Sequence, residues 1–93
     1  MKFLAIETEL KSINNNDKSK FLKEEAEAVL ELKNNGVIQE IYFNEEHCAV
    51  IILNCDSIEE AEIHLNKLPL VINGFIKFNI MHLNPYTGFD RLV

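Results

Sequence analysis

The sequence predicts one α+β domain whose elements follow the order strand, helix, strand, strand, helix, strand. Segments in which apolar and polar residues alternate are typical of strands, and an apolar residue every three or four positions is typical of helices. Both patterns are present, and they succeed one another in that order along the chain. A chain of 93 residues has the size of one domain, so residues 1–93 are expected to fold as one unit.

The first predicted strand covers residues 2–10, whose side chains alternate between two faces of a sheet. The two sets are Leu4, Ile6, Thr8 and Leu10 on one face, and Phe3, Ala5, Glu7 and Glu9 on the other. The polar run Asn14–Asp17 then provides residue types that favour a helix N-cap. A helix is expected from about Lys18 to Asn35, and Gly36 follows it at a position that often adopts a left-handed conformation.

Two further strands are predicted at Val37–Phe43 and Cys48–Cys55, joined as a hairpin by the turn Asn44–His47. The third strand is apolar on both faces from Ala49 to Leu53. Such a strand needs cover on both sides, whereas two helices suffice for only one side of a sheet. The second side is therefore expected to pack against the same sheet of another subunit.

The second half of the chain predicts a helix and a last strand. Ser57 and Glu60 have the spacing of a capping box, which marks a helix start. The helix is expected to end before Pro69, because proline cannot continue it, and its apolar stripe consists of Ile58, Ala61, Leu65 and Leu68. The fourth strand is expected at Gly74–Leu83. Residues 84–93 are too apolar for a free tail and are expected to lie on a neighbouring subunit.

The composition argues against several classes of partner. Fifteen acidic and nine basic side chains give a formal net charge of −6, and no stretch concentrates Lys and Arg. Nucleic acids and acidic membrane surfaces are therefore not expected partners. No apolar run is long enough to cross a bilayer, and the apolar start ends at Glu7, too early for a signal peptide. The protein is expected in the cytoplasm.

Cys48 and Cys55 are expected to be buried, reduced thiols. Seven residues apart on one strand, their Cα atoms would lie roughly 23 Å apart at ~3.3 Å per residue. A disulfide requires less than about 7 Å, and reduced thiols agree with a cytoplasmic location. The three histidines lack the spacing of metal ligands, so no metal and no other cofactor is expected.

The predicted order of elements is that of the ferredoxin-like fold, a four-stranded antiparallel sheet with two helices on one face. Two such sheets packed face to face form a dimeric α/β barrel with a cavity between them. Five segments of the chain also match a known family of such proteins, in the same order and at the same spacing: Phe21–Gly36, His47 after the turn, Ser57–Glu59, Leu68–Leu70, and the strand that leads to Pro85. With one short gap near Asp56, the chain thereby resembles muconolactone isomerase and its relatives over nearly its whole length.

The resemblance implies subunits paired into barrels and a higher assembly in which C-termini reach onto neighbours. It also implies a cofactor-free shift of a double bond in an unsaturated lactone acid, which requires a base and a group that holds the developing enolate. The first three strands depart from the family pattern, because apolar or different polar residues stand where the family has basic or polar groups: Leu4, Ile6, Gln39, Glu40, Phe43 and Val50.

Glu25 is the main candidate for proton transfer. On a helical wheel it falls inside the apolar stripe, between Val29 and Leu32, whereas the other carboxylates of this helix point to solvent. The resemblance places a glutamate of the isomerase at this position. A carboxyl group in a poorly solvated site has a raised pKa and can act as an acid or a base near neutral pH. The alternative is a side chain at the edge of the stripe whose carboxylate reaches water.

His47 and Tyr42 are the candidates for assisting groups. His47 corresponds to a histidine of the isomerase in the resemblance, and its alternative is an exposed histidine of the turn. Strict alternation along the second strand predicts that Tyr42, Glu40 and Ile38 share one face.

Glu40, Lys77 and His82 are the candidates for substrate binding. Glu40 and Lys77, together with Tyr42, would suit a small acid or ketone if they converge in the cavity, and otherwise form a polar rim. His82 lies on the face of Phe78 and Ile80, either at the cavity mouth or in the core.

Three functions remain open from the sequence. The first is a small isomerase-like enzyme that transfers a proton on an unsaturated lactone or related small molecule in an inter-subunit cavity. The second is a non-catalytic, oligomeric module of the same fold that binds a small molecule. The third is a cofactor-free monooxygenase of the dimeric-barrel type, which requires an aromatic-lined pocket.

Overall fold

Four antiparallel strands form one sheet in the order β2-β3-β1-β4 in the computed structural model, which describes residues 1–93. The strands are β1 (Lys2–Glu9), β2 (Ile38–Phe43), β3 (Ala49–Asn54) and β4 (Ile76–Leu83). The first and last strands of the chain pair side by side, and the hairpin of β2 and β3 adds to the other edge of β1. This is the split βαβ arrangement, so the predicted ferredoxin-like fold is confirmed.

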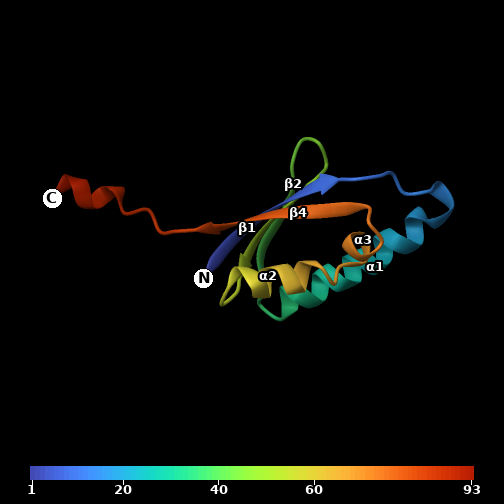
Figure 1. Ribbon diagram of the computed structural model, residues 1–93, viewed down its shortest axis with the longest axis horizontal. Coiled ribbons are helices and arrows are strands. Elements are labelled where there is room, and N and C mark those ends of the chain that lie inside the picture. The colour runs from blue at the N-terminus through green and yellow to red at the C-terminus, as the bar shows by residue number, and fades with distance from the viewer.

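The helices lie on one side of the sheet (Figure 1). They are α1 (Asn15–Asn34), α2 (Ile58–Leu65) and the short α3 (Pro69–Ile72), and a 3₁₀ helix η1 (Gly88–Leu92) follows β4. The sequence did not predict α3. α2 ends at Leu65, before Pro69 as expected but too early to include Leu68, which is the N-cap residue of α3. Pro69 occupies the first turn of α3, where a missing N–H costs nothing.

The pairing of β1 with its two neighbouring strands shows which side chains of the sheet face the helices. Phe3 stands opposite Leu53 on β3 and His82 on β4, and Ala5 stands opposite Ile51 and Ile80. These side chains face the helices, so we call this side of the sheet the inner face. The fully buried core there consists of Phe3, Ala5, Ile38, Ile51, Leu53, Ala61, Leu65 and Leu68.

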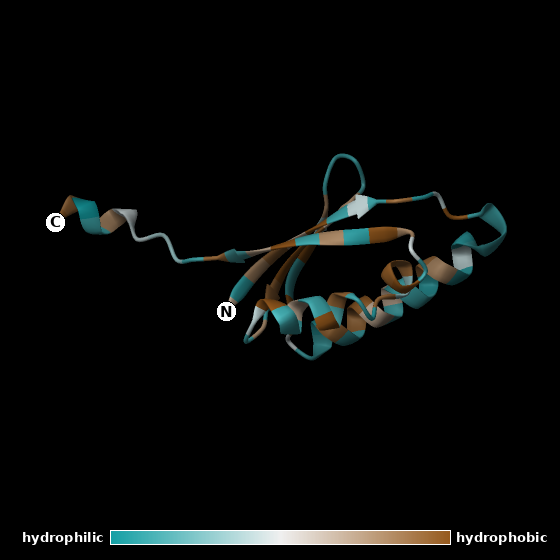
Figure 2. Cartoon of the chain, in the orientation of Figure 1, coloured by the Kyte–Doolittle hydropathy of each residue, from teal (hydrophilic) through white to brown (hydrophobic).

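The opposite side of the sheet has no cover within the chain, and we call it the open face. Its centre is apolar, built from Leu4, Ile6, Val50 and Ile52 of the two middle strands, all half-buried. Tyr42 and Met81 flank this centre, with 58% and 48% of their surface exposed. Figure 2 shows apolar and polar residues alternating along β4, as expected for a strand with two different faces.

A bulge in β2 makes one expectation from the sequence wrong. The pairing with β3 shifts between Ile38 and Glu40, so strict alternation fails there. Ile38 pairs with Leu53 and is buried on the inner face, whereas Glu40 pairs with Ile52 and Tyr42 with Val50 on the open face.

The ends of α1 follow from local side-chain chemistry. The helix begins earlier than predicted because the N-cap is Asn14, whose side chain accepts a hydrogen bond from the Asn16 N–H at 2.9 Å. After its last turn, Gly36 adopts φ +80°, the left-handed conformation expected there.

The turn between β2 and β3 is held by one side chain. The Asn44 Oδ1 atom accepts hydrogen bonds from the backbone N–H groups of Glu46 and Cys48, at 3.0 and 2.9 Å. His47 takes φ +63°, an uncommon conformation for a residue with a side chain. Both cysteines are free as predicted; Cys55 is buried, but Cys48 precedes β3 and is only half-buried.

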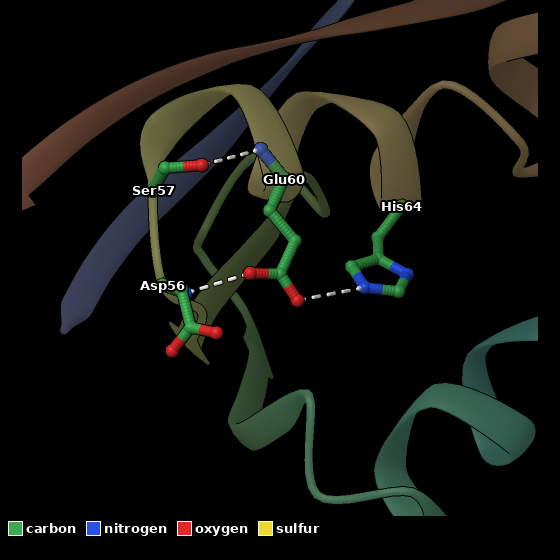
Figure 3. Close-up of polar contacts among 4 residues, drawn as sticks. All are labelled: Asp56, Ser57, Glu60 and His64. Atoms are coloured by element: carbon green, nitrogen blue, oxygen red, sulfur yellow. Dashed lines mark hydrogen bonds and ion pairs between the residues drawn. The ribbon is translucent and has the colours of Figure 1, made fainter.

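The N-terminus of α2 carries the predicted capping box, in a shifted form (Figure 3). The Ser57 Oγ atom accepts a hydrogen bond from the Glu60 N–H at 3.1 Å. In turn, the Glu60 Oε2 atom accepts a hydrogen bond from the Asp56 N–H at 2.7 Å. In the usual capping box the donor is the N–H of the N-cap residue itself, one residue later. The Glu60 Oε1 atom lies 3.6 Å from the His64 Nε2 atom, one turn further along the helix.

The C-terminal segment extends away from the sheet (Figure 1). The molecule accordingly measures 60 × 27 × 19 Å along its principal axes. Tyr86, Phe89 and Leu92 are exposed to 71%, 69% and 82%, and the two aromatic rings pack edge to face on each other. None of the helices is both long and apolar enough to cross a membrane.

Replacing Ser57 with Ala is expected to destabilise the fold by about 1 kcal/mol, because the Glu60 N–H loses its acceptor at the start of α2. Urea denaturation measures the change in the free energy of unfolding. Ser12→Ala is the control, since Ser12 is exposed in the β1–α1 loop. An equal loss in both variants would contradict the capping role.

Candidate functional site

A cavity of about 640 Å³ opens between α1 and the inner face of the sheet, near the end of β1 and the turn after β2. It lies within one chain, on the helix side of the sheet, and is distinct from the cavity predicted between two paired sheets. Two small side chains on facing elements, Ala26 of α1 and Ala49 of β3, border it. The rest of its apolar wall includes Ile13, Leu22, Val29, Ile41, Leu70, Phe75 and Ile76.

Glu25 reaches this cavity from α1. Its Oε1 atom accepts a hydrogen bond from the Leu70 N–H at 3.0 Å, near the start of α3. The N-cap residue of α3, Leu68, offers no side-chain acceptor, so Glu25 satisfies from another helix an N–H that a capping side chain usually serves. Burial raises the pKa of Glu25; the Leu70 N–H opposes this in part, and the charge of Glu7 adds to it.

Glu7 is a second carboxyl group at the same cavity. It follows Phe3 and Ala5 on the inner face of β1, and its Oε1 atom accepts a hydrogen bond from the Ala49 N–H at 3.2 Å. Burial raises the pKa of the nearby Cys48 thiol, and the charge of Glu7 raises it further. Alternation along β1 predicts this face for Glu7, and a carboxylate on the face of Phe3 and Ala5 is the sequence signal for its role, but Glu7 was not among the predicted site residues.

His47 lines the cavity from the turn between β2 and β3. Its ring stacks on Phe43, with centroids 4.0 Å apart and planes inclined by 18°. The stacking and the left-handed backbone of His47 fix the direction of the imidazole. The ring stays exposed to solvent, so it belongs to the cavity mouth rather than to the interior.

Tyr42 also borders the cavity, but its hydroxyl forms its hydrogen bond on the open face. The Tyr42 Oη atom donates a hydrogen bond to the Glu40 Oε1 atom at 2.7 Å, on the open face. This hydrogen bond is the main cause of a raised pKa at Tyr42. The hydroxyl therefore does not point at Glu25 across the inner cavity.

The structure does not bring the three expected substrate-binding residues together. Glu40 and Lys77 both lie on the open face, but on the two edge strands, with β3 and β1 between them. At ~4.8 Å per strand this separates them by at least about 14 Å across the sheet. His82 lies on the inner face opposite Phe3, with ring centroids 5.2 Å apart. That is about 13 Å from Glu7 along β1 at ~3.3 Å per residue.

Two lysines that were not among the predicted site residues also line the cavity. Lys11 follows β1, and its Nζ atom lies 4.9 Å from the centroid of the Phe75 ring, which also lines the cavity. Lys18 belongs to the first turns of α1. No sequence pattern marks either lysine as a site residue. They reach one cavity only because α1 packs back across the sheet. No group of three or more His, Cys, Asp or Glu side chains is arranged to hold a metal ion.

Comparisons with known proteins support the fold. No protein-family model matches the chain, and no curated protein matches it in sequence. The solved structure of muconolactone isomerase superposes with a TM-score of 0.79 at 17% identity, over 94% of this chain and 92% of the isomerase. A 5-chloro-2-hydroxyhydroquinone dehydrochlorinase from Burkholderia phenoliruptrix AC1100, solved with 2,5-dihydroxybenzoquinone, gives a TM-score of 0.65 at 12% identity, over 95% and 98% of the two chains.

These likenesses establish that the chain has the fold of muconolactone isomerase, as the resemblance of the sequences predicted. At 12% and 17% identity they concern the arrangement of the backbone and leave the chemistry to the side chains of this chain.

Replacing Glu25 with Gln removes the ionisable group and leaves an acceptor for the Leu70 N–H. Because the pKa of Glu25 is raised by folding, the folded chain binds more protons than the unfolded chain between the ordinary pKa and the raised one. The contribution of Glu25 to stability therefore falls as the pH rises through this window. We expect the stability of Glu25→Gln relative to wild type to increase as the pH rises above the ordinary pKa of 4.5, measured by urea denaturation.

The matched control is Glu24→Gln, one residue earlier on the exposed side of α1. If both variants change relative to wild type with the same dependence on pH, the explanation from burial of Glu25 is wrong.

Proposed function

We propose that this protein is a cofactor-independent enzyme that moves a proton on a small unsaturated lactone or a related cyclic carbonyl compound, with Glu25 as the proton-transfer group. The observation that carries the proposal is the Glu25 carboxyl group in a largely apolar cavity, held in place by the Leu70 N–H. A carboxyl group whose pKa is raised by burial is suited to general acid–base catalysis.

The surrounding groups suit the charge changes of such a reaction. Removal of a proton next to a carbonyl group develops negative charge on the carbonyl oxygen, which a donor or a cation stabilises. Lys11 and Lys18 supply positive charge at the cavity, and His47 supplies a ring N–H at its mouth. In this proposal His47 retains the assisting role expected from the sequence, whereas the lysines take the part assigned to Tyr42.

The names of the two similar structures agree with this class of chemistry. One is an isomerase of a lactone, and the other acts on a substituted hydroquinone and was solved with a quinone. Both compounds are small, oxygenated and cyclic, and a cavity of about 640 Å³ has room for a molecule of that size.

A second candidate is a non-catalytic module that binds such a compound in the same cavity. The observation that favours it is the structural task of Glu25 at the start of α3, which is sufficient reason for a buried acceptor at this position. In this case the cavity binds the ligand, and Glu25 only joins α1 to α3.

Proton transfer is tested with a panel of unsaturated lactone acids, muconolactone among them, incubated in D₂O and followed by NMR. We expect wild type to form the double-bond isomer with deuterium incorporated, and Glu25→Gln to do so roughly 10²- to 10⁴-fold more slowly. Glu24→Gln is the control and is expected to react like wild type. Equal rates for wild type and Glu25→Gln would end the assignment of Glu25.

Binding separates the two candidates. Titration with the same lactones and with 2,5-dihydroxybenzoquinone, followed by NMR shifts of cavity residues, reports occupancy without turnover. Saturable binding by wild type together with no deuterium incorporation and no isomer would favour the binding module over the enzyme.

We further propose that the protein is a homodimer in which the open faces of two sheets pack together, with residues 84–93 lying on a neighbouring subunit. The support is the apolar centre of the open face, formed by Leu4, Ile6, Val50 and Ile52, and the exposed aromatic residues of the tail. Apolar surface of this kind on a small chain is typical of an interface between subunits.

Light scattering behind a sizing column is expected to give at least twice the chain mass of 10.7 kDa. Ile6→Glu, which introduces a carboxylate at the centre of the open face, is expected to shift the protein toward the monomer. Ile63→Glu is the matched control, because Ile63 is 56% exposed on α2, away from the open face. A monomer of wild type at micromolar concentration would contradict the dimer.

A further inference from the structure

We infer that Glu7 is a second catalytic carboxyl group, paired with Glu25 across the cavity, and that one of the two accepts a proton from the substrate while the other delivers one. The inference rests on the proposed function, because it assigns a partner to Glu25 in that reaction. It begins from the placement of the two groups: Glu7 comes from β1 and Glu25 from α1, and both line the same cavity.

The two carboxyl groups are anchored in the same manner. In each, the Oε1 atom accepts one backbone N–H: Ala49 for Glu7 at 3.2 Å, and Leu70 for Glu25 at 3.0 Å. The Cys48 thiol is a further hydrogen-bond partner of the Glu7 carboxyl group. A backbone N–H therefore holds each group at the cavity wall.

Glu7 occupies a position where an apolar side chain would be expected. It continues the inner-face series of Phe3 and Ala5, both buried in the core. Glu7 itself is half-buried. It accepts the Ala49 N–H, just beyond the last paired residues of β1 and β3, Ile6 and Val50.

Two carboxyl groups from facing elements are what a 1,3-shift of a proton requires. An ionised carboxylate breaks a C–H bond next to the carbonyl group and keeps the proton, and the electron pair moves into the enolate. A protonated carboxyl group then gives its proton to the carbon two positions away, and the double bond forms in its new place. The substrate gains and loses one proton, and solvent at the open mouth returns the pair to its starting state.

The charges around the pair favour different roles for the two carboxyl groups. Burial and the charge of Glu7 raise the pKa of Glu25, which suits Glu25 as the protonated member and Glu7 as the ionised one. The other charged or titratable groups that line the cavity are Glu9, Lys11, Lys18, Tyr42 and His47, and the Cys48 thiol lies next to Glu7. The two lysines offset the charge of the ionised carboxylate and of the enolate.

The test compares Glu7→Gln, Glu25→Gln and the double variant on the lactone that wild type converts, in D₂O with NMR. We expect Glu7→Gln to lose both deuterium exchange at the carbon that gives up its proton and formation of the isomer, each roughly 10²-fold or more. Glu25→Gln is expected to retain exchange at that carbon and to lose the isomer. Gln at position 7 still offers an acceptor to the Ala49 N–H, and thermal unfolding checks that each variant is folded.

The outcomes separate this inference from the proposed function. If Glu25→Gln loses exchange as well as isomer while Glu7→Gln reacts like wild type, Glu25 acts alone and the pair is refuted, but the proposed function stands. If wild type converts none of the lactones, the proposed function fails.

A measurement without turnover then decides whether the pair exists. The titration of the ¹³C-labelled Glu25 carboxyl group is compared in wild type and Glu7→Gln. We expect the pKa of Glu25 to fall when the charge of Glu7 is removed, and an unchanged pKa would overturn the pairing. Glu24→Gln is the control in both experiments.

Discussion

The structure depends on the position of β1 between two other strands. Because β3 and β4 both pair with it, β1 has no free edge, and its side chains alternate between the helix layer and the uncovered side. Phe3 and Ala5 thereby reach the core, and Glu7 reaches the cavity at the end of the same row. Leu4 and Ile6 form the apolar centre of the open face. A shift of one residue in the pairing would exchange core and surface along the whole strand.

The fold could be predicted from the sequence because its signals are local. Alternation identifies β1, the polar run after it identifies the start of a helix, and the spacing of Ser57 and Glu60 identifies α2. The errors also have local causes. α3 is too short to have a period, and the bulge between Ile38 and Glu40 changes the face of every later residue in β2. Tyr42 and Glu40 therefore lie on the open face, whereas strict alternation had placed them on the face of Ile38.

The candidate site could be predicted only in part, because it is assembled by contacts between distant parts of the chain. The helical wheel placed Glu25 on the apolar side of its helix, but its partner Leu70 lies 45 residues later, in the helix that the sequence did not predict. His47 was selected by a resemblance, and its stacking on Phe43 follows from a turn conformation that no sequence pattern indicates. Lys11 and Lys18 lie in or next to the loop after β1, and only the return of α1 over the sheet brings them to the cavity.

The acidic composition does not prevent this cavity from holding an anionic substrate. The formal charge of −6 is distributed over the whole chain, and exposed charges beyond about 8 Å are largely screened at physiological ionic strength. The charges that matter are those lining the cavity, where Lys11 and Lys18 stand beside Glu7, Glu9 and Glu25. Because the pKa of Glu25 is raised, its carboxyl group carries less negative charge than an exposed glutamate does at the same pH. The burial that makes Glu25 a suitable acid thus also reduces the repulsion that an anion meets on entering.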